Sequence, residues 1–163
     1  MPLSIVNFVG ILLYLTHSHP DISFVVGLVA RYMQHPHESH WKATKRILRY
    51  IRGIVQFRIH YSTGATSLLV GFIDSDWAGD PDDQKSTAGY VFTLGSRPIT
   101  WACKKQSALS LSYAEAKYCE TVKASKEAMW LRQILSEFGF EQEHTTTLWS
   151  NNQSVIQLCK DPV

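Results

Sequence analysis

The sequence predicts an α/β protein in which helices pack on a mixed β-sheet, preceded by a small helical segment. Two observations carry this prediction. Hydrophobic residues recur at helical spacing through the first third of the chain and alternate at strand spacing from Gln56 onward. The later order of elements is strands, a long helix, a further strand and a further helix, which is typical of a mixed sheet. The chain is therefore expected to divide into a helical segment over residues 1–55 and an α/β domain over residues 56–163.

Two apolar helices are expected at the start of the chain. Residues 4–16 are apolar almost all round, so this helix needs cover from a partner. Pro20 then interrupts the helix, and Asp21 is placed to cap a second helix that runs to about Gln34. The apolar run over residues 8–15 is too short to span a bilayer, which takes about 20 residues, and it has no basic flank or cleavage site. We therefore expect a soluble intracellular protein, in the cytoplasm or nucleus, with no secretory signal and no membrane partner.

A third helix is expected to begin at Glu38 or Ser39 and to end before Gly53, a residue suited to a C-terminal cap. Its apolar residues lie on one side: Trp41, Ile47, Leu48 and Ile51. Basic residues recur on another side at three- and four-residue spacing: Lys42, Lys45, Arg46, Arg49 and Arg52. Such a stripe suits the phosphate backbone of a nucleic acid, and the alternative is a solvated amphipathic helix.

The composition, 45% hydrophobic and 18% charged, is that of a globular protein and excludes a disordered chain. Residues 1–64 hold seven basic against two acidic side chains, and residues 65–163 hold nine against twelve. This division suggests a phosphate-facing surface beside an acidic site, although two ordinary solvated faces would give the same counts. Cys103, Cys119 and Cys159 are odd in number and lack CxxC spacing, so we expect reduced thiols.

The second part of the chain alternates strand patterns with turn residues. The expected strands are residues 56–62, 67–76, 88–94, 98–103 and 145–150. The third and fourth of these form a hairpin that turns at Gly95-Ser96. A long helix is expected from Ser112 to Phe138, ending at Gly139, and another helix begins near Asn152. Core packing is expected for Trp77, Tyr90, Phe92, Trp101, Trp130, Leu131 and Ile134, rather than a role in base stacking.

The most informative segment for chemistry is GFIDSDWAGD, which begins at Gly71. Asp74 and Asp76 are two residues apart, so a strand places both carboxylates on the same face. Carboxylates at the end of a central strand are costly unless they are solvated, paired or bound to a metal. The alternative is a strand that runs out into an acidic loop.

Several stretches together resemble the ribonuclease H region of copia-type retrotransposon Pol polyproteins and the end of the preceding reverse-transcriptase region. They are GILLYLTHSHPDISFVVGLVARYMQHPHESHWKATKRILRYIRG, LVGFIDSDWAGDPDDQKSTAGYVFTLGSRPITWACKKQ, LSYAEAKY, EAMWLRQIL and NNQSVIQLCKDPV, in the family's order. The resemblance implies a ribonuclease H-like fold for residues 56–163, incomplete at the C-terminus, and a reverse-transcriptase connection segment for residues 1–55. It also implies hydrolysis of the RNA strand of RNA–DNA hybrids with two Mg²⁺ (or Mn²⁺) ions held by carboxylates.

Carried over one position at a time, the family's carboxylates are only partly retained. Asp74 matches the first-strand aspartate and is the expected metal ligand. In LSYAEAKY the position of the helix glutamate is Lys117, and in WSNNQS the position of the third carboxylate is Asn151. Asp76 and Glu115 are possible accessory residues, but Glu115 lies about 200° around the helix from position 117 and cannot simply replace it.

We therefore expect nuclease activity to be absent or strongly impaired and metal binding to be weak or absent. Lys117 is predicted to turn toward Asp74 and to fill the vacated metal position as an internal ion pair. The implied partners are an RNA–DNA hybrid or other nucleic acid and the remainder of a Pol polyprotein. Phosphate contacts are expected from Lys104, Lys105, Gln106 and Gln153. The alternatives are a non-catalytic nucleic-acid-binding module or a domesticated interaction module; a secreted effector fits less well because no secretory signal is recognised.

Overall fold

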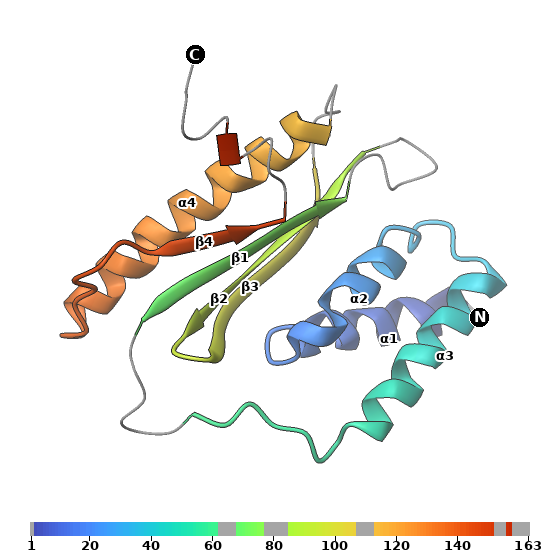
Figure 1. The fold of residues 1–163 in the computed structure, drawn as a ribbon. Coiled ribbons are helices and arrows are strands. Elements are labelled where there is room, and N and C mark those ends of the chain that lie inside the picture. The colour runs from blue at the N-terminus through green and yellow to red at the C-terminus, as the bar shows by residue number, and fades with distance from the viewer. Residues whose placement is uncertain (1, 62–67, 77–84, 107–112, 152–155, 158–163) are drawn as a thin grey trace. The chain divides into compact units, whose positions relative to one another are not determined.

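The computed structural model describes residues 2–61, 68–76, 85–106, 113–151 and 156–157 (Figure 1). The chain forms two compact units, Met1–Arg58 and Ile59–Val163. This boundary falls three residues after the division expected at residue 55.

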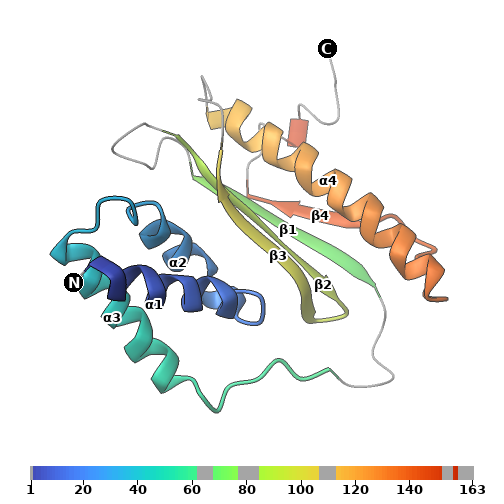
Figure 2. The same cartoon turned by 180° about the vertical axis from the view of Figure 1, so that it is seen from behind.

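The first unit contains only helices: α1 (Pro2–Leu15), the short 3₁₀ helix η1 (Pro20–Ile22), α2 (Ser23–Ala30) and α3 (Glu38–Gly53). Figure 2 shows these helices from behind. They enclose one apolar core of Ile5, Val9, Leu12, Ile22, Val26, Val29 and Ile47. The expected apolar side of α3 is confirmed, because Ile47 is buried while Trp41, Leu48 and Ile51 pack against this core. No helix in the described part of the chain is long and apolar enough to cross a membrane.

Both cap assignments in this unit are wrong. Asp21 lies inside η1 and accepts a hydrogen bond from the Tyr50 hydroxyl at 2.7 Å, so it ties η1 to α3 instead of capping a helix. The helix after it ends at Ala30, because turns replace it over residues 31–34. Gly53 is the last residue of α3 and lacks a positive φ, so Ile54 takes the C-cap position.

The described residues of the second unit form a four-stranded mixed sheet with one long helix. The strands are β1 (Leu69–Asp76), β2 (Thr87–Leu94), β3 (Arg97–Lys105) and β4 (Thr147–Ser150), in the order β3-β2-β1-β4. β1 pairs antiparallel with β2 and parallel with β4, and α4 (Tyr113–Glu137) connects β3 to β4 (Figure 1). The predicted α/β class, the hairpin and the long helix are therefore confirmed. Gly95 and Gly139 adopt φ values of 64° and 79°, which favour glycine at these two turns.

One face of the sheet packs against one side of α4. Ala124, Ala128, Leu131 and Leu135 of this side are buried with Leu69, Ile73 and the fully buried Phe92. The packing is tight at Gly71, where a Cβ would lie 2.5 Å from Leu148 Cδ2 and 2.7 Å from Phe92 Cε1. A glycine in the middle of β1 is thus required by the close approach of its neighbours.

The strand expected over residues 56–62 is wrong, because its described residues pair with no neighbouring strand. Two of them, His60 and Tyr61, are held to the hairpin by other hydrogen bonds: the Tyr61 hydroxyl donates to Pro98 O and the Arg97 Nε donates to His60 O, both at 2.5 Å. Trp130 is 54% exposed and is not a core residue. Position 130 lies about 130° around α4 from its buried side.

The remaining core assignments are mixed. Phe92 and Leu131 are buried, as expected, whereas Tyr90, Trp101 and Ile134 are half-buried. Trp77, most of the polar loop after β1 and the start of the helix expected near residue 152 lie outside the described residues. Only the end of that segment is described, and Ile156 and Gln157 have helical backbone.

Candidate active site

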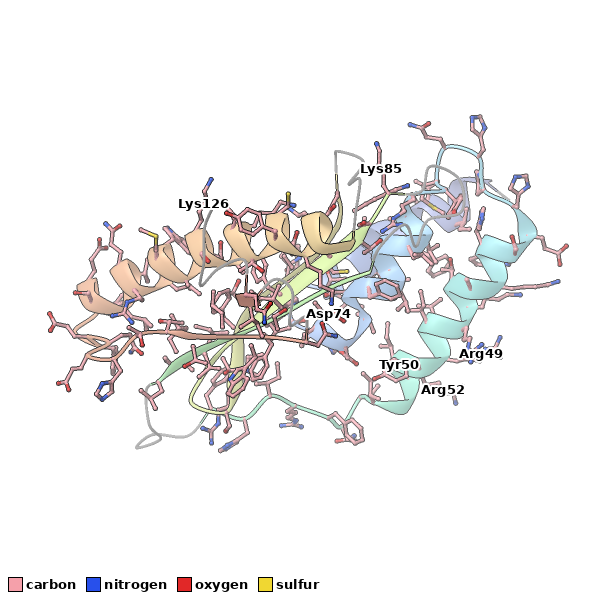
Figure 3. All side chains as sticks on the ribbon, turned by 45° about the horizontal axis from the view of Figure 1, so that its top comes forward. Arg49, Tyr50, Arg52, Asp74, Lys85 and Lys126 are labelled. Carbon is pink, nitrogen blue, oxygen red and sulfur yellow. The ribbon has the colours of Figure 1, made fainter. Side chains whose placement is uncertain are left out.

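Three elements bring the predicted site residues to one edge of the sheet. Because β1 and β4 are parallel, their carboxyl ends meet at the same edge. Ile73 pairs with Ser150, so the next residue of each segment, Asp74 and Asn151, lie side by side. Lys117, in the second turn of α4, reaches this edge from the helix that covers the sheet. Figure 3 labels Asp74 at this position.

The three side chains form a closed triangle of hydrogen bonds. The Lys117 ammonium donates to Asp74 Oδ1 at 3.0 Å and also to Asn151 Oδ1. The Asn151 amide donates in turn to the same Asp74 oxygen at 3.4 Å. The ion pair expected between Lys117 and Asp74 is therefore present, and Asn151 contributes a second acceptor that the sequence alone did not predict.

Burial is distributed unequally across the ion pair. The Lys117 side chain is 3% exposed, whereas that of Asp74 is 77% exposed. A buried ammonium is costly unless it is paired and hydrogen-bonded, and the two oxygens of Asp74 and Asn151 provide this compensation. The lysine stem thus fills space between α4 and the sheet, and its charge is neutralised at the surface.

Comparison with known proteins identifies the origin of the chain. It is 39% identical over 157 residues to the Pol polyprotein of transposon RE2 from Arabidopsis thaliana, covering 96% of this chain and 11% of the polyprotein. It is 38% identical over 154 residues to that of transposon TNT 1-94 from Nicotiana tabacum. The chain belongs to the copia-type retrotransposon Pol polyproteins. It spans about a tenth of the length of these relatives.

One shorter relative of this copia-type chain is the secreted RxLR effector protein 161 of Plasmopara viticola. The two are 37% identical over 124 residues, which cover 76% of this chain and 87% of the effector. No family model matches the chain. No solved structure matches it either.

The site residues that the structure describes do not fit a Mg²⁺ ion. Mg²⁺ prefers anionic oxygen ligands in octahedral geometry, whereas Asp74, Lys117 and Asn151 together carry no net charge. In the described part of the chain, no group of three or more His, Cys, Asp or Glu could hold a metal ion. The side chains of Asp76 and Glu115, the possible accessory residues of this copia-type chain, lie outside the described residues.

The residues near this site that were expected to bind phosphate differ in how deeply they are buried. β3 is antiparallel to β2, so its end lies at the same sheet edge as Asp74. Lys104 is exposed and Lys105 half-buried there. Gln106 is buried at 6% exposure, and its backbone N–H donates to Ser86 O at 2.8 Å, which indicates a structural role for this residue. Gln153 lies outside the described residues.

The basic stripe of α3 belongs to the first unit of the copia-type chain. All five of its side chains, Lys42, Lys45, Arg46, Arg49 and Arg52, are exposed. Lys42 pairs with Glu38 at 3.0 Å, and the Lys45 ammonium lies 5.6 Å from the centre of the Trp41 ring. Figure 3 labels Arg49 and Arg52 on this helix.

A second buried charge on α4 was not indicated by any sequence motif. Glu120 is 5% exposed and pairs with Lys123 at 3.1 Å. Burial raises the pKa of the nearby Tyr90 hydroxyl, and the carboxylates of Glu127 and Glu120 raise it further. The spacing of Glu120 and Lys123, three residues apart on a helix, was the available signal for their ion pair.

Proposed function

We propose that residues 59–163 are the ribonuclease H-like domain of a copia-type Pol polyprotein in which an internal ion pair has replaced the metal centre. The observation that carries the proposal is the position of the Lys117 ammonium, 3.0 Å from Asp74 Oδ1 and hydrogen-bonded to Asn151 Oδ1. The domain keeps the fold and hydrolyses RNA–DNA hybrids at a negligible rate or not at all.

The topology supports the first part of this proposal. The chain resembles the ribonuclease H region of the family, which implies a mixed sheet whose central strand carries the first catalytic aspartate. Here β1 is such a strand: it lies between β2 and β4 and carries Asp74 near its carboxyl end. The two positions where the family has further carboxylates are Lys117 and Asn151, and both lie within hydrogen-bonding distance of Asp74.

The charges support the second part. Relative to three carboxylates, an ammonium and an amide raise the charge of the site by three units. At about 4 Å and an effective dielectric constant near 20, each pair of unit charges contributes roughly 4 kcal/mol. A divalent ion at that distance from the Lys117 ammonium would meet two such repulsions, and the one remaining carboxylate roughly cancels them. No net attraction is left to offset dehydration of Mg²⁺, which loses its water ligands reluctantly.

The first test is hydrolysis of a labelled RNA–DNA hybrid by the purified chain in Mg²⁺ and then in Mn²⁺. We expect no cleavage by the wild-type chain and partial recovery in the double variant Lys117→Glu/Asn151→Asp. Lys126→Glu on the outer side of α4 is the control for a charge change of the same sign elsewhere on the helix. Cleavage by the wild-type chain that is lost in Asp74→Ala would contradict the proposal.

The second test measures metal binding independently of catalysis. Without metal, the double variant places three carboxylates together, and its melting temperature should fall below that of the wild-type chain. Millimolar Mg²⁺ should raise the melting temperature of the double variant, because a ligand that binds only the folded state stabilises it, and should leave the wild-type chain unchanged. An equal Mg²⁺ response in both proteins would show that Lys117 does not exclude the metal.

A second candidate function is nucleic-acid binding without hydrolysis. The observation that favours it is the stripe of five exposed basic residues on α3. We expect weak, strongly salt-dependent binding of the hybrid, and substitution of Arg49 and Arg52 by alanine should reduce the salt slope by about one unit per lost phosphate contact. Lys126→Ala is the control. Binding that is independent of salt, or unchanged by the two arginine substitutions, would rule out this stripe as the binding surface.

A further inference from the structure

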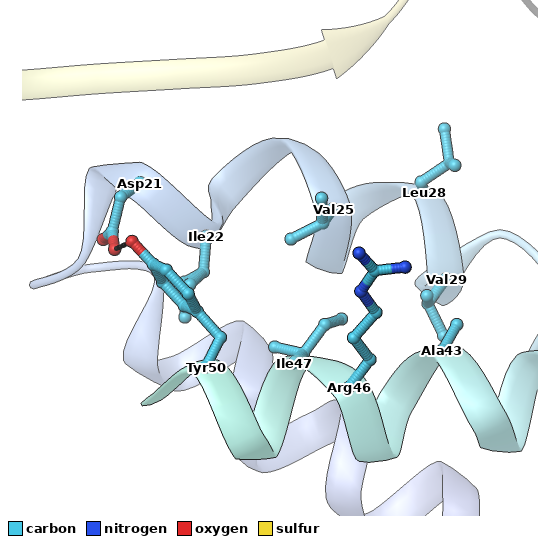
Figure 4. A pocket seen from close by; sticks show the side chains of 9 residues that line it. All are labelled: Asp21, Ile22, Val25, Leu28, Val29, Ala43, Arg46, Ile47 and Tyr50. Atoms are coloured by element: carbon cyan, nitrogen blue, oxygen red, sulfur yellow. Dashed lines mark hydrogen bonds between the residues drawn. The ribbon is translucent and has the colours of Figure 1, made fainter. Parts of the chain in front are cut away.

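The first unit contains an apolar groove that is not part of the site described above. It lies between α2 and α3 and has a volume of about 520 Å³ (Figure 4). The α2 side presents Ile22, Val25, Leu28 and Val29, and the α3 side presents Ala43, Arg46, Ile47 and Tyr50. Each side spans seven residue steps, which is about 10 Å of helix, so the groove matches about two turns of a packed helix.

The groove leaves apolar surface in water. Val25 and Leu28 on its rim are each 40% exposed, and Tyr50 is 49% exposed. Apart from Asp21, residues 1–30 contain no charged side chain, so little on α1 or α2 solvates this region. Contiguous exposed apolar surface of this kind typically marks an interaction site.

Two opposite charges border the groove at separate places. Asp21 lies at one end, where it accepts the hydrogen bond from Tyr50. Arg46 reaches across the groove toward α2, with Val25 and Ile47 between it and Asp21 (Figure 4). Among the residues that the structure describes, Arg46 has no hydrogen-bond or ion-pair partner.

We propose that this groove is the interface of a symmetric dimer, in which α2 of each copy packs against the groove of the other. A two-fold axis makes residue i contact residue j of the partner and residue j contact residue i. An axis near Val25 and Ile47 therefore places Arg46 of each copy opposite Asp21 of the other copy, so that both charges are paired. Val25 and Leu28, which protrude on the rim, fill the apolar floor of the partner's groove.

The charge pattern favours a second copy over other occupants. An anionic ligand, whether a phosphate or a fatty acid, would be attracted by Arg46 but repelled by Asp21. A partner that carries one charge of each sign in the same spacing satisfies both, and the groove of a second copy has this spacing. The dimer also leaves three residues of the basic stripe available, because Lys45, Arg49 and Arg52 lie roughly a third of a turn or more around α3 from the groove.

Sedimentation analysis of the full chain over a concentration series tests the proposal. We expect the wild-type chain to dimerise reversibly, and Arg46→Glu and Asp21→Lys each to raise the dissociation constant about tenfold or more, since each creates two like-charge contacts. The decisive sample is an equimolar mixture of the two single variants, in which both contacts of the mixed dimer again join opposite charges. The mixture should dimerise about as tightly as the wild-type chain.

Two controls separate this interface from general effects. Arg49→Glu changes the same charge on α3 outside the groove and should leave the dissociation constant unchanged. Tyr50→Phe removes the hydrogen bond to Asp21 without changing a charge and should have a smaller effect than Asp21→Lys. The proposal is overturned if the wild-type chain is monomeric throughout, if the mixture associates no better than either variant alone, or if Arg49→Glu weakens the dimer equally.

Discussion

Removal of the Asp74 carboxylate should destabilise the second unit by more than the loss of an exposed charge normally does. Exposed ion pairs contribute about 0–1 kcal/mol, but Lys117 in this pair is 3% exposed. Removal of one partner from a fully buried pair costs about 3–5 kcal/mol, because the other charge is left uncompensated. Since the Asp74 side chain is 77% exposed and Asn151 still accepts from the ammonium, we expect roughly 2 kcal/mol for Asp74→Ala.

The companion variant is Lys117→Met, which keeps most of the side-chain volume and removes the charge. Replacement of a buried ion by an apolar side chain of similar shape is often neutral or stabilising, so we expect a change within about 1 kcal/mol. Asp74→Ala in the Lys117→Met background should then cost little. The coupling energy between the two positions should therefore be between about 1 and 2 kcal/mol.

Urea unfolding followed by tryptophan fluorescence measures these free energies. Four of the five tryptophans lie in residues 59–163, so the signal reports mainly on the unit that contains the site. Equal slopes of free energy against urea among the variants are needed for the comparison. A cost below about 0.5 kcal/mol for Asp74→Ala, or additive effects of the two substitutions, would show that the ion pair does not compensate a buried charge.

Two further predictions concern packing and titration. Gly71→Ala should destabilise the chain by about 1–3 kcal/mol, since the added Cβ would meet Leu148 and Phe92. Gly10→Ala is the control and should not destabilise the chain, because an added Cβ there would have nothing within 4 Å. Urea unfolding of the two variants distinguishes these outcomes. The hydrogen bond to Asp21 raises the pKa of Tyr50 in the folded state. This bond therefore stabilises the fold at pH values below the ordinary tyrosine pKa, and its contribution is lost as the pH rises through the raised pKa of the folded state. Ultraviolet titration should show a lower Tyr50 midpoint in Asp21→Asn, and an unchanged midpoint would contradict this assignment.

Features governed by local chemistry could be predicted from the sequence. The hairpin depends on a glycine with positive φ at residue 95, and the packed side of α4 follows from the spacing of Ala124, Ala128, Leu131 and Leu135. The Lys117–Asp74 ion pair was predicted from the resemblance to the copia-type family, which assigns both positions to one site, and the helix spacing supported it. Position 117 shares the packed side of the helix, so its charge had to reach a compensating group at the sheet edge.

Features that depend on distant parts of the chain could not be predicted in this way. The alternating pattern over residues 56–62 fits a strand, but a strand exists only where a neighbour accepts its backbone hydrogen bonds. His60 and Tyr61 are held by Arg97 and Pro98 instead. Asp21 has the chemistry of a helix cap, but Tyr50, 29 residues away, takes its carboxylate. Hydrophobicity alone suggested a buried Trp130, although its position on α4 points it to solvent.

Lys117 and Asn151 together leave the site with Asp74 electrically neutral, which neither residue would do alone. A lysine beside two aspartates would leave one negative charge, and a glutamate beside Asp74 and Asn151 would leave two negative charges without a cation. Lys117 together with Asn151 gives a neutral site, in which the amide oxygen accepts from the ammonium and the amide nitrogen donates to Asp74. The sheet edge is therefore stabilised by the protein's own cation. The buried core of Phe92 and the packed side of α4 contains none of these three side chains, so it does not depend on the site.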